Sequence, residues 1–215
     1  MFDEGVLELV KSRPVHSIVY IAGATCSGKT TLVDWLRSRL EGTQVVSMDN
    51  YLRDLNDPKL PPRGGRYPVF DNPEAYHMDE LAGDLRRLLA GEDVEMPIYG
   101  TIENRRLAGR VTVPGKASYY LVEGPYAFYL SFVKKEIVLA RSSRVFDAGI
   151  EGLKIFVTAD KQVLHDRRFA RDRKLYPVMV SDENIERNLE LIARATDDLI
   201  ILPQQCEADL VVMTT

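Results

Sequence analysis

Short apolar runs alternate with helical patterns of apolar and polar positions along most of this 215-residue chain. The runs are rich in β-branched and aromatic residues, and they predict five strands at about 16–22, 44–48, 118–123, 153–158 and 208–213. Strands that are separated by helices pair in parallel, and helices then cover both faces of the sheet. The pattern therefore predicts a single α/β domain over residues 1–215, built on a five-stranded parallel sheet.

Two of the expected helices are marked clearly. Behind the first strand, apolar side chains recur at helical spacing and predict a helix over 29–40. A second helix has start and stop signals: Asn72 is its expected N-cap, Pro73 its first helical residue, and Gly91 follows its last residue. We expect this helix to run without a break from Asn72 to the residue before Gly91.

The chain is irregular between the second strand and this helix. Residues 50–69 hold six proline and glycine residues, which is too many for a regular element. A loop of this length is either functional or a mobile surface linker, and the sequence leaves both alternatives open. Further along, residues 94–117 predict a small hairpin excursion that ends at Pro114 and Gly115.

Composition narrows the class of protein. Hydrophobic residues make up 45% and charged residues 28% of the chain, which is ordinary for a globular domain. A net charge of −4 argues against a general binder of nucleic acid or of anionic membranes. There is no long apolar run and the N-terminus is acidic, so we expect a cytoplasmic protein with no membrane partner. We expect Cys26 and Cys206 to be reduced, and the three histidines show no metal-ligand spacing with them.

Residues 23–30 read Gly-Ala-Thr-Cys-Ser-Gly-Lys-Thr and complete the phosphate-binding pattern G-x-x-x-x-G-K-[ST]. Glycines let such a loop curl so that successive N–H groups point at phosphate oxygens. Lys29 adds a positive charge at the β- and γ-phosphates, and Thr30 supplies a hydroxyl for Mg²⁺. A predicted strand precedes the loop and a predicted helix follows it, so we expect a nucleoside triphosphate to bind. The expected contacts are Gly23, Ala24, Thr25, Cys26, Ser27, Gly28, Lys29, Thr30 and Thr31.

Two carboxylates follow predicted strands: Asp49 lies just past the second strand, and Glu123 ends the third. In an open α/β sheet, ligands bind outside the carboxyl ends of the strands, so both carboxylates should lie near the phosphate-binding loop. We expect Asp49 to accept the proton of an attacking hydroxyl group and Glu123 to belong to a Mg²⁺ site. The alternative for each is a carboxylate that caps a neighbouring helix.

A further helix is expected to begin near Lys161 and to carry a densely basic face. Such a face can clamp a transferring phosphate when the helix closes over the site. The alternative is a solvated face on which Asp166 and Asp172 pair with the basic residues. The basic residues are Arg167, Arg168, Arg171 and Lys174.

Together these features resemble the uridine kinase and phosphoribulokinase group of phosphate-loop kinases, from about residue 16 to residue 213. Six segments in the family's order and spacing carry the resemblance. They are 23–31, 47–51, 70–75, 97–99, 122–124 and 167–172. The resemblance implies a phosphate-loop fold of the nucleoside and nucleotide kinase type.

The resemblance also implies catalytic roles. Asp49 would activate the acceptor hydroxyl and lie in the metal site, while Thr30 and Glu123 would hold Mg²⁺ beside ATP. Arg168 and Arg171 would reach the phosphates and the acceptor from a lid at about 167–182. The implied catalytic residues are Asp49, Lys29, Arg168 and Arg171.

On the acceptor side, the resemblance implies that Phe70 and Tyr99 line the pocket, beside the hairpin at 94–117, and that Asp71 binds sugar hydroxyls. Gly100 and Asn104 stand where uridine kinases usually have an aspartate and a base-reading histidine, so Asn104 is the expected substitute contact.

The acceptor that follows is a small molecule with a hydroxyl group, first the 5′-hydroxyl of a ribonucleoside. Nicotinamide riboside, a phosphorylated sugar and a pantothenate-like alcohol are alternatives with the same chemistry. A slow nucleotide-binding module that signals to a protein partner is an alternative from another class. The family permits a homo-oligomer without requiring one.

Overall fold

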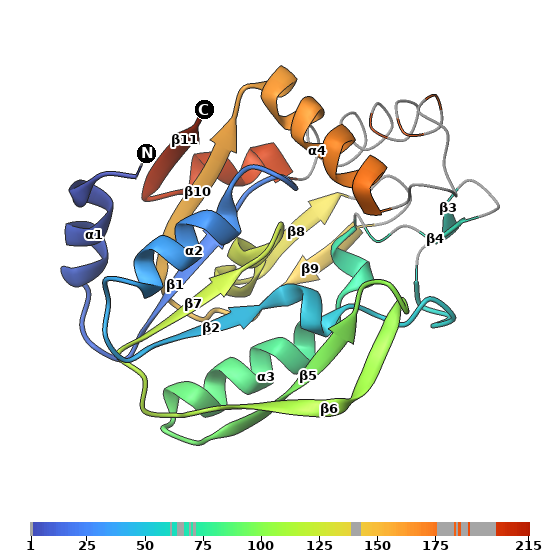
Figure 1. Ribbon diagram of the computed structural model, residues 1–215. Helices are drawn as coiled ribbons and strands as arrows, with labels where there is room; N and C mark the ends of the chain where they lie inside the picture. The colour runs from blue at the N-terminus through green and yellow to red at the C-terminus, as the bar shows by residue number, and fades with distance from the viewer. Residues whose placement is uncertain are drawn as a thin grey trace.

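The computed structural model describes residues 2–60, 62–63, 67–68, 70, 72–138, 143–175 and 201–215, together with residues 183, 185 and 189. A five-stranded sheet forms the centre, in the order β11-β10-β1-β7-β2, and every neighbouring pair in it is parallel (Figure 1). All five predicted strands are present, within two residues of the predicted bounds. They are β1 (Ser17–Ala22), β2 (Thr43–Ser47), β7 (Tyr119–Glu123), β10 (Leu153–Ala159) and β11 (Leu210–Thr214).

Helices cover both faces of the sheet (Figure 1). The helices are α1 (Glu4–Lys11), α2 (Lys29–Arg37), α3 (Met78–Leu89) and α4 (Lys161–Leu175). Along β1, Val19 and Ile21 pack in a core with α1 and α2, while Ile18 and Tyr20 pack in a second core with α3. This alternation follows from the two-residue period of a strand, and it explains why the strand is apolar at nearly every position. Among the described residues, no helix has the length and apolar character needed to cross a lipid bilayer.

Three small antiparallel pairs and four 3-10 helices complete the described fold. The pairs are β3 (Pro62–Arg63) with β4 (Tyr67–Pro68), β5 (Val94–Gly100) with β6 (Arg105–Val113), and β8 (Lys135–Val138) with β9 (Ser143–Phe146). The 3-10 helices are η1 (Met48–Tyr51), η2 (Pro73–Ala75), η3 (Ala127–Ser131) and η5 (Leu202–Glu207). The β5–β6 hairpin lies within the segment where the sequence predicts a hairpin, whereas α1 and the β8–β9 pair were not predicted.

The prediction of one unbroken helix from Asn72 is wrong. The Asn72 side chain does act as a cap, since its Oδ1 accepts from the Glu74 N–H at 2.8 Å, but it caps only the short η2. Tyr76 then adopts an extended conformation, with φ −109° and ψ 147°, and pairs with Leu52. The α-helix therefore begins at Met78, because pairing with a distant segment overrides the local signal.

Candidate active site

The register of the parallel sheet aligns the carboxyl ends of three strands. Ile21 near the end of β1 lies opposite Glu123 at the end of β7, and Glu123 lies opposite Ser47 at the end of β2. The phosphate-binding loop follows β1 directly, and Asp49 lies in η1 just past β2. The loop, Glu123 and Asp49 are therefore at one edge of the sheet, where ligands bind in open α/β folds.

The backbone of the phosphate-binding loop takes a shape that depends on glycine. Gly23 has φ +147° and Gly28 has φ +99°, both in the region that side chains disfavour. A Cβ atom on Gly23 would lie 2.0 Å from the carbonyl oxygen of Val157 in β10, which leaves no room for a side chain. Helix α2 begins immediately after Gly28, so its N–H groups face the loop.

The polar groups of the loop fit a phosphate. The Lys29 ammonium donates to the carbonyl oxygens of Gly23 at 2.9 Å and Ala24 at 2.8 Å, which holds it inside the curl of the loop. Burial lowers the pKa of Lys29, while the negative charges of Glu123 and Asp49 oppose that shift. Ser27 is fully buried, and its Oγ has no hydrogen-bond partner among the described residues. A phosphate group supplies acceptors for both side chains.

A cavity of about 520 Å³ opens beside the loop, which is enough for a nucleotide-sized ligand. It is bordered by the loop, the start of α2, helix α4 and the end of β11. Its lining includes Cys26, Gly28, Lys29, Thr30, Thr31, Arg167 and Thr214. Five of the nine predicted loop contacts therefore border one cavity.

Glu123 is held by two hydroxyl groups. Thr30 donates to Oε2 at 3.3 Å, and Ser47 donates to Oε1 at 3.3 Å. Burial raises the pKa of Glu123, Asp49 acts in the same direction, and Lys29 acts against it. The oxygens of Thr30 and Glu123 are the hard donors that Mg²⁺ prefers. In the described part of the chain, no group of three or more His, Cys, Asp or Glu residues could hold a metal ion, so Mg²⁺ here would also need phosphate and water oxygens.

Asp49 lies in the first turn of η1, close to the charges of the loop. Burial raises its pKa, and three groups oppose that effect: the Lys29 ammonium, a hydrogen bond from Tyr76 and the charge of Arg171. A buried carboxylate beside an ammonium can accept a proton from a hydroxyl group positioned next to it. The geometry therefore suits the general-base role expected for Asp49.

The first two arginines of the basic helix α4 form hydrogen bonds to the backbone of the phosphate-binding loop. Arg167 donates to the Cys26 carbonyl oxygen at 3.3 Å, and the buried Arg168 donates to the Thr25 carbonyl oxygen at 3.0 Å. Thr214 of β11 donates to the Ser27 carbonyl oxygen at 2.8 Å and accepts from Arg167 at 3.0 Å. Helix α4 and strand β11 thus hold the backbone of the loop in its curled form.

Arg171 differs from these two arginines. Its guanidinium pairs with Asp172, with contacts of 2.8 Å and 2.6 Å, as the alternative of a solvated face predicts. Its positive charge nevertheless acts to lower the pKa of Asp49, against the effect of burial. The part of the predicted lid beyond Leu175, residues 176–182, lies outside the described residues.

The expected acceptor-side residues are only partly described. Tyr99 is buried, its hydroxyl donates to the Arg53 carbonyl oxygen at 3.2 Å, and its N–H donates to the Asn50 side chain at 3.2 Å. Burial raises the pKa of Tyr99 to about 12, so the phenol stays protonated. Phe70 is half-buried and packs against the core, whereas Asp71 lies outside the described residues.

Asn104 lies in the turn between β5 and β6. It has a left-handed conformation with φ +50°, and its side-chain amide donates to the Ile102 carbonyl oxygen at 3.4 Å. The Asn104 carbonyl oxygen accepts from the Leu55 N–H at 2.9 Å, which ties the turn to the loop after Asp49. The described contacts of Asn104 are therefore those of a turn residue.

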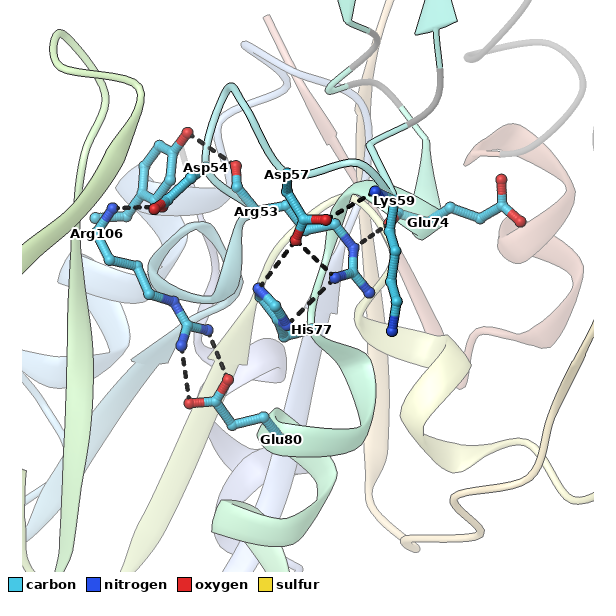
Figure 2. Close-up of polar contacts among 9 residues, drawn as sticks. Arg53, Asp54, Asp57, Lys59, Glu74, His77, Glu80 and Arg106 are labelled. Atoms are coloured by element: carbon cyan, nitrogen blue, oxygen red, sulfur yellow. Dashed lines mark hydrogen bonds and ion pairs between the residues drawn. The ribbon is translucent and has the colours of Figure 1, made fainter.

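A polar network anchors the loop that follows Asp49 (Figure 2). Arg53 donates to the Glu74 carbonyl oxygen at 2.8 Å and to Asp57 at 3.0 Å. His77 lies between these two side chains, 3.5 Å from Arg53 and 4.0 Å from Asp57. The network anchors this part of 50–69 to the start of α3 and to the segment before it.

The hairpin joins the same network (Figure 2). The N–H of Arg106 donates to Asp54 at 2.8 Å, and its guanidinium binds both oxygens of Glu80 in α3, at 3.1 Å and 2.6 Å. The loop, the β5–β6 hairpin and the first turn of α3 are thus linked to one another.

Sequence reasoning missed several residues of the site. Thr214 contacts the loop and Tyr76 contacts Asp49, although neither residue belongs to a motif. His77 lies in the polar network, although no role was expected for it. Ser47 had a usable signal, because its position at the end of a predicted strand places it next to Glu123 in a parallel sheet.

A curled phosphate-binding loop at the end of a central parallel strand, with two carboxylates beside its lysine, defines a phosphate-loop kinase. This class includes the uridine kinases, which are phosphotransferases that act on a hydroxyl group. Within the class, the chain belongs to the Phosphoribulokinase / Uridine kinase family, which it matches over residues 18–214.

Similar proteins carry kinase names. The chain is 29% identical over 206 residues to uridine-cytidine kinase B of Dictyostelium discoideum, covering 91% of this chain and 73% of that protein. It is 30% identical over 158 residues to the uridine kinase of Deinococcus deserti, covering 72% of this chain and 68% of that protein. The structure of phosphoribulokinase from Rhodobacter spheroides has a TM-score of 0.59 at 16% identity, covering 92% of this chain and 70% of that chain, and it shows the shared fold.

Proposed function

We propose that the chain transfers the γ-phosphoryl group of ATP, in a Mg²⁺-dependent reaction, to a primary hydroxyl group of a small molecule. The observation that carries the proposal is the placement of Lys29, Asp49 and Glu123 at one edge of the sheet. The 5′-hydroxyl of a ribonucleoside is the first candidate acceptor, because the relatives are named for uridine and cytidine.

In this reaction, the acceptor oxygen forms a bond to the γ-phosphorus and its proton passes to Asp49. The bond between the γ-phosphorus and the β–γ bridging oxygen breaks, and its electrons remain on ADP. Lys29 and the N–H groups of the loop stabilise the charge on the phosphate oxygens. Mg²⁺ neutralises part of that charge when it is bound, and Thr30 and Glu123 are the residues that would hold it. Arg171 would reach the phosphates from the lid, and its positive charge acts to lower the pKa of Asp49.

The contacts of Asn104 support keeping a second acceptor class in the proposal. Its side-chain amide is bonded within its own turn, to Ile102, rather than presented as a base-reading group. Nicotinamide riboside, a phosphorylated sugar or a pantothenate-like alcohol would need no pyrimidine contact at this position. The transfer chemistry is the same for each of them.

The test is ADP release with ATP and Mg²⁺ against uridine, cytidine, nicotinamide riboside, sugar phosphates and pantothenate. We expect turnover that depends on one acceptor class. Asp49→Ala should abolish it and leave ATP affinity unchanged, while Asp34→Ala, an exposed carboxylate in α2, serves as the matched control and should have no effect. Tight ATP binding without turnover on any acceptor would instead favour a regulatory module, and unchanged turnover in Asp49→Ala would remove Asp49 from the mechanism.

A further inference from the structure

The Tyr76 hydroxyl donates a hydrogen bond to Oδ1 of Asp49 at 3.5 Å. Tyr76 is buried, with 4% of its surface exposed, so its hydroxyl is largely shielded from solvent. No sequence motif pairs the two residues, which come from η1 and from the segment between η2 and α3. The contact therefore results from the tertiary fold.

A short antiparallel backbone pairing positions Tyr76 so that its hydroxyl lies beside Asp49. Leu52 and Tyr76 form an antiparallel bridge. On either side of it, the Arg53 N–H donates to the Ala75 carbonyl oxygen at 2.8 Å, and the His77 N–H donates to the Tyr51 carbonyl oxygen at 2.8 Å. Three consecutive residues of each segment are thus fixed in register, and one of these segments is the continuation of the turn that carries Asp49.

The Tyr76 ring is also fixed. It packs edge to face against the buried ring of Tyr126, with 5.6 Å between centroids and 79° between planes. A ring held by packing on one side and by the backbone pairing on the other loses few rotamers when it bonds to Asp49. Replacing Tyr76 by Phe would keep the ring contact and remove only the hydroxyl.

We infer that Tyr76 is a positioning residue, which holds the Asp49 carboxylate by Oδ1 and so leaves Oδ2 directed to take the proton of the acceptor. The inference rests on the proposed phosphoryl transfer. A carboxylate in the first turn of a short 3-10 helix can rotate about its side-chain torsions, and a hydrogen bond from a fixed donor restricts that rotation. The orientation of the base affects the transfer step and leaves the binding of ATP and acceptor unchanged.

The kinetic test compares Tyr76→Phe with Tyr20→Phe. Tyr20 is a matched control, because it is also buried and its hydroxyl donates a hydrogen bond, at 2.9 Å, to the Ile150 carbonyl oxygen, away from Asp49. We expect Tyr76→Phe to lower kcat about threefold, the size expected for one long hydrogen bond, with both KM values unchanged. Tyr20→Phe should leave kcat unchanged. An equal kcat in wild type and Tyr76→Phe would overturn the inference.

A second measurement needs no turnover. In a double-mutant cycle of urea unfolding, Tyr76→Phe and Asp49→Ala should give non-additive changes, whereas Tyr20→Phe and Asp49→Ala should add. Additive changes in the first cycle would show that Tyr76 does not act through Asp49. If the wild-type protein turns over no acceptor, the proposed function fails, and the cycle still decides whether the two residues are coupled.

Discussion

Glu123 accepts a hydrogen bond from Thr30 at 3.3 Å, although the two residues are 93 positions apart in the chain. The pairing of β1 with β7 explains the contact, because it places Glu123 beside the strand that leads into the phosphate-binding loop. The carboxylate therefore lies at the start of helix α2, next to the Thr30 hydroxyl. Both groups have oxygen atoms of the kind that Mg²⁺ prefers as ligands.

The first prediction concerns this carboxylate. Glu123→Gln keeps the size of the side chain and removes its charge, so it should weaken Mg²⁺ binding in the presence of ATP by roughly 10- to 100-fold, as the loss of a supporting metal contact does elsewhere. The measurement is turnover as a function of Mg²⁺ concentration. Glu41→Gln, at an exposed position, is the control. Superimposable Mg²⁺ curves for wild type and Glu123→Gln would refute a metal role for this residue.

The second prediction compares two glycines. Gly23→Ala introduces a Cβ that would meet the Val157 carbonyl oxygen at 2.0 Å, so it should abolish ATP binding and lower the free energy of unfolding by more than about 1 kcal/mol. Gly83 lies inside α3 with nothing within 4 Å of an added Cβ. Gly83→Ala should raise the free energy of unfolding by about 0.5–1 kcal/mol, as expected inside a helix, and leave ATP binding intact. Urea unfolding measures the stability of both variants, and calorimetric titration measures their ATP binding. Equal stability and equal ATP affinity in the two variants would contradict the prediction.

The third prediction concerns the pH dependence of stability. Burial lowers the pKa of His77 below its ordinary value of 6.5, and the positive charges of Arg106 and Arg53 act in the same direction, against Glu80 and Asp57. Between the lowered pKa and 6.5 the unfolded chain binds more protons than the folded chain, so the free energy of unfolding should fall as the pH drops below about 6.5.

The measurement is urea unfolding of wild type and His77→Gln between about pH 7.5 and pH 5. The variant has no group to titrate at this position, so its stability should fall less over this range. Parallel curves for the two proteins would show that His77 titrates alike in the folded and unfolded states.

The fourth prediction concerns the ion pair that joins the hairpin to α3. Arg106 binds both oxygens of Glu80, and a lysine can bind only one oxygen at a time. Arg106→Lys should therefore speed amide hydrogen exchange in β5 and β6 while leaving exchange in β1 and β7 unchanged. Arg110→Lys, on the same strand, is the control, because within the described part of the chain the Arg110 side chain donates to the Glu95 carbonyl oxygen and forms no ion pair. If amide exchange in β5 and β6 is equally fast in Arg106→Lys and Arg110→Lys, the ion pair does not stabilise the hairpin.

The sequence predicts the central sheet and the phosphate-binding loop because both depend on local residue patterns. The central strands β1 and β7 are apolar at nearly every position since helices cover both faces, and the loop needs glycine where φ is positive. The prediction of a helix from Asn72 was wrong because it rested on local signals alone. Its cap and proline signals act within one turn, and they carry no information about the pairing of Tyr76 with Leu52.

The side-chain contacts of the site depend on tertiary packing and could not be read from the sequence. The arginines of the basic helix look alike in the sequence, but Arg167 and Arg168 donate to backbone carbonyl oxygens of the loop, while Arg171 pairs with Asp172. The way α4 packs against β11 and the loop decides which arginine bonds to the loop and which pairs with a neighbouring aspartate. Tyr76 carries no sequence signal at all, because its hydroxyl reaches Asp49 only after two distant segments pair.

The alignment of Ile21, Glu123 and Ser47 across three strands has a consequence for the folding kinetics. Strand β7 joins the sheet between β1 and β2, which precede it by a long stretch of chain, so the chain must lose the entropy of closing that loop before the site exists. A partly folded chain without β7 has no complete site for the triphosphate. Saturating nucleotide should therefore slow unfolding and leave the refolding rate unchanged, since the ligand recognises only the finished sheet.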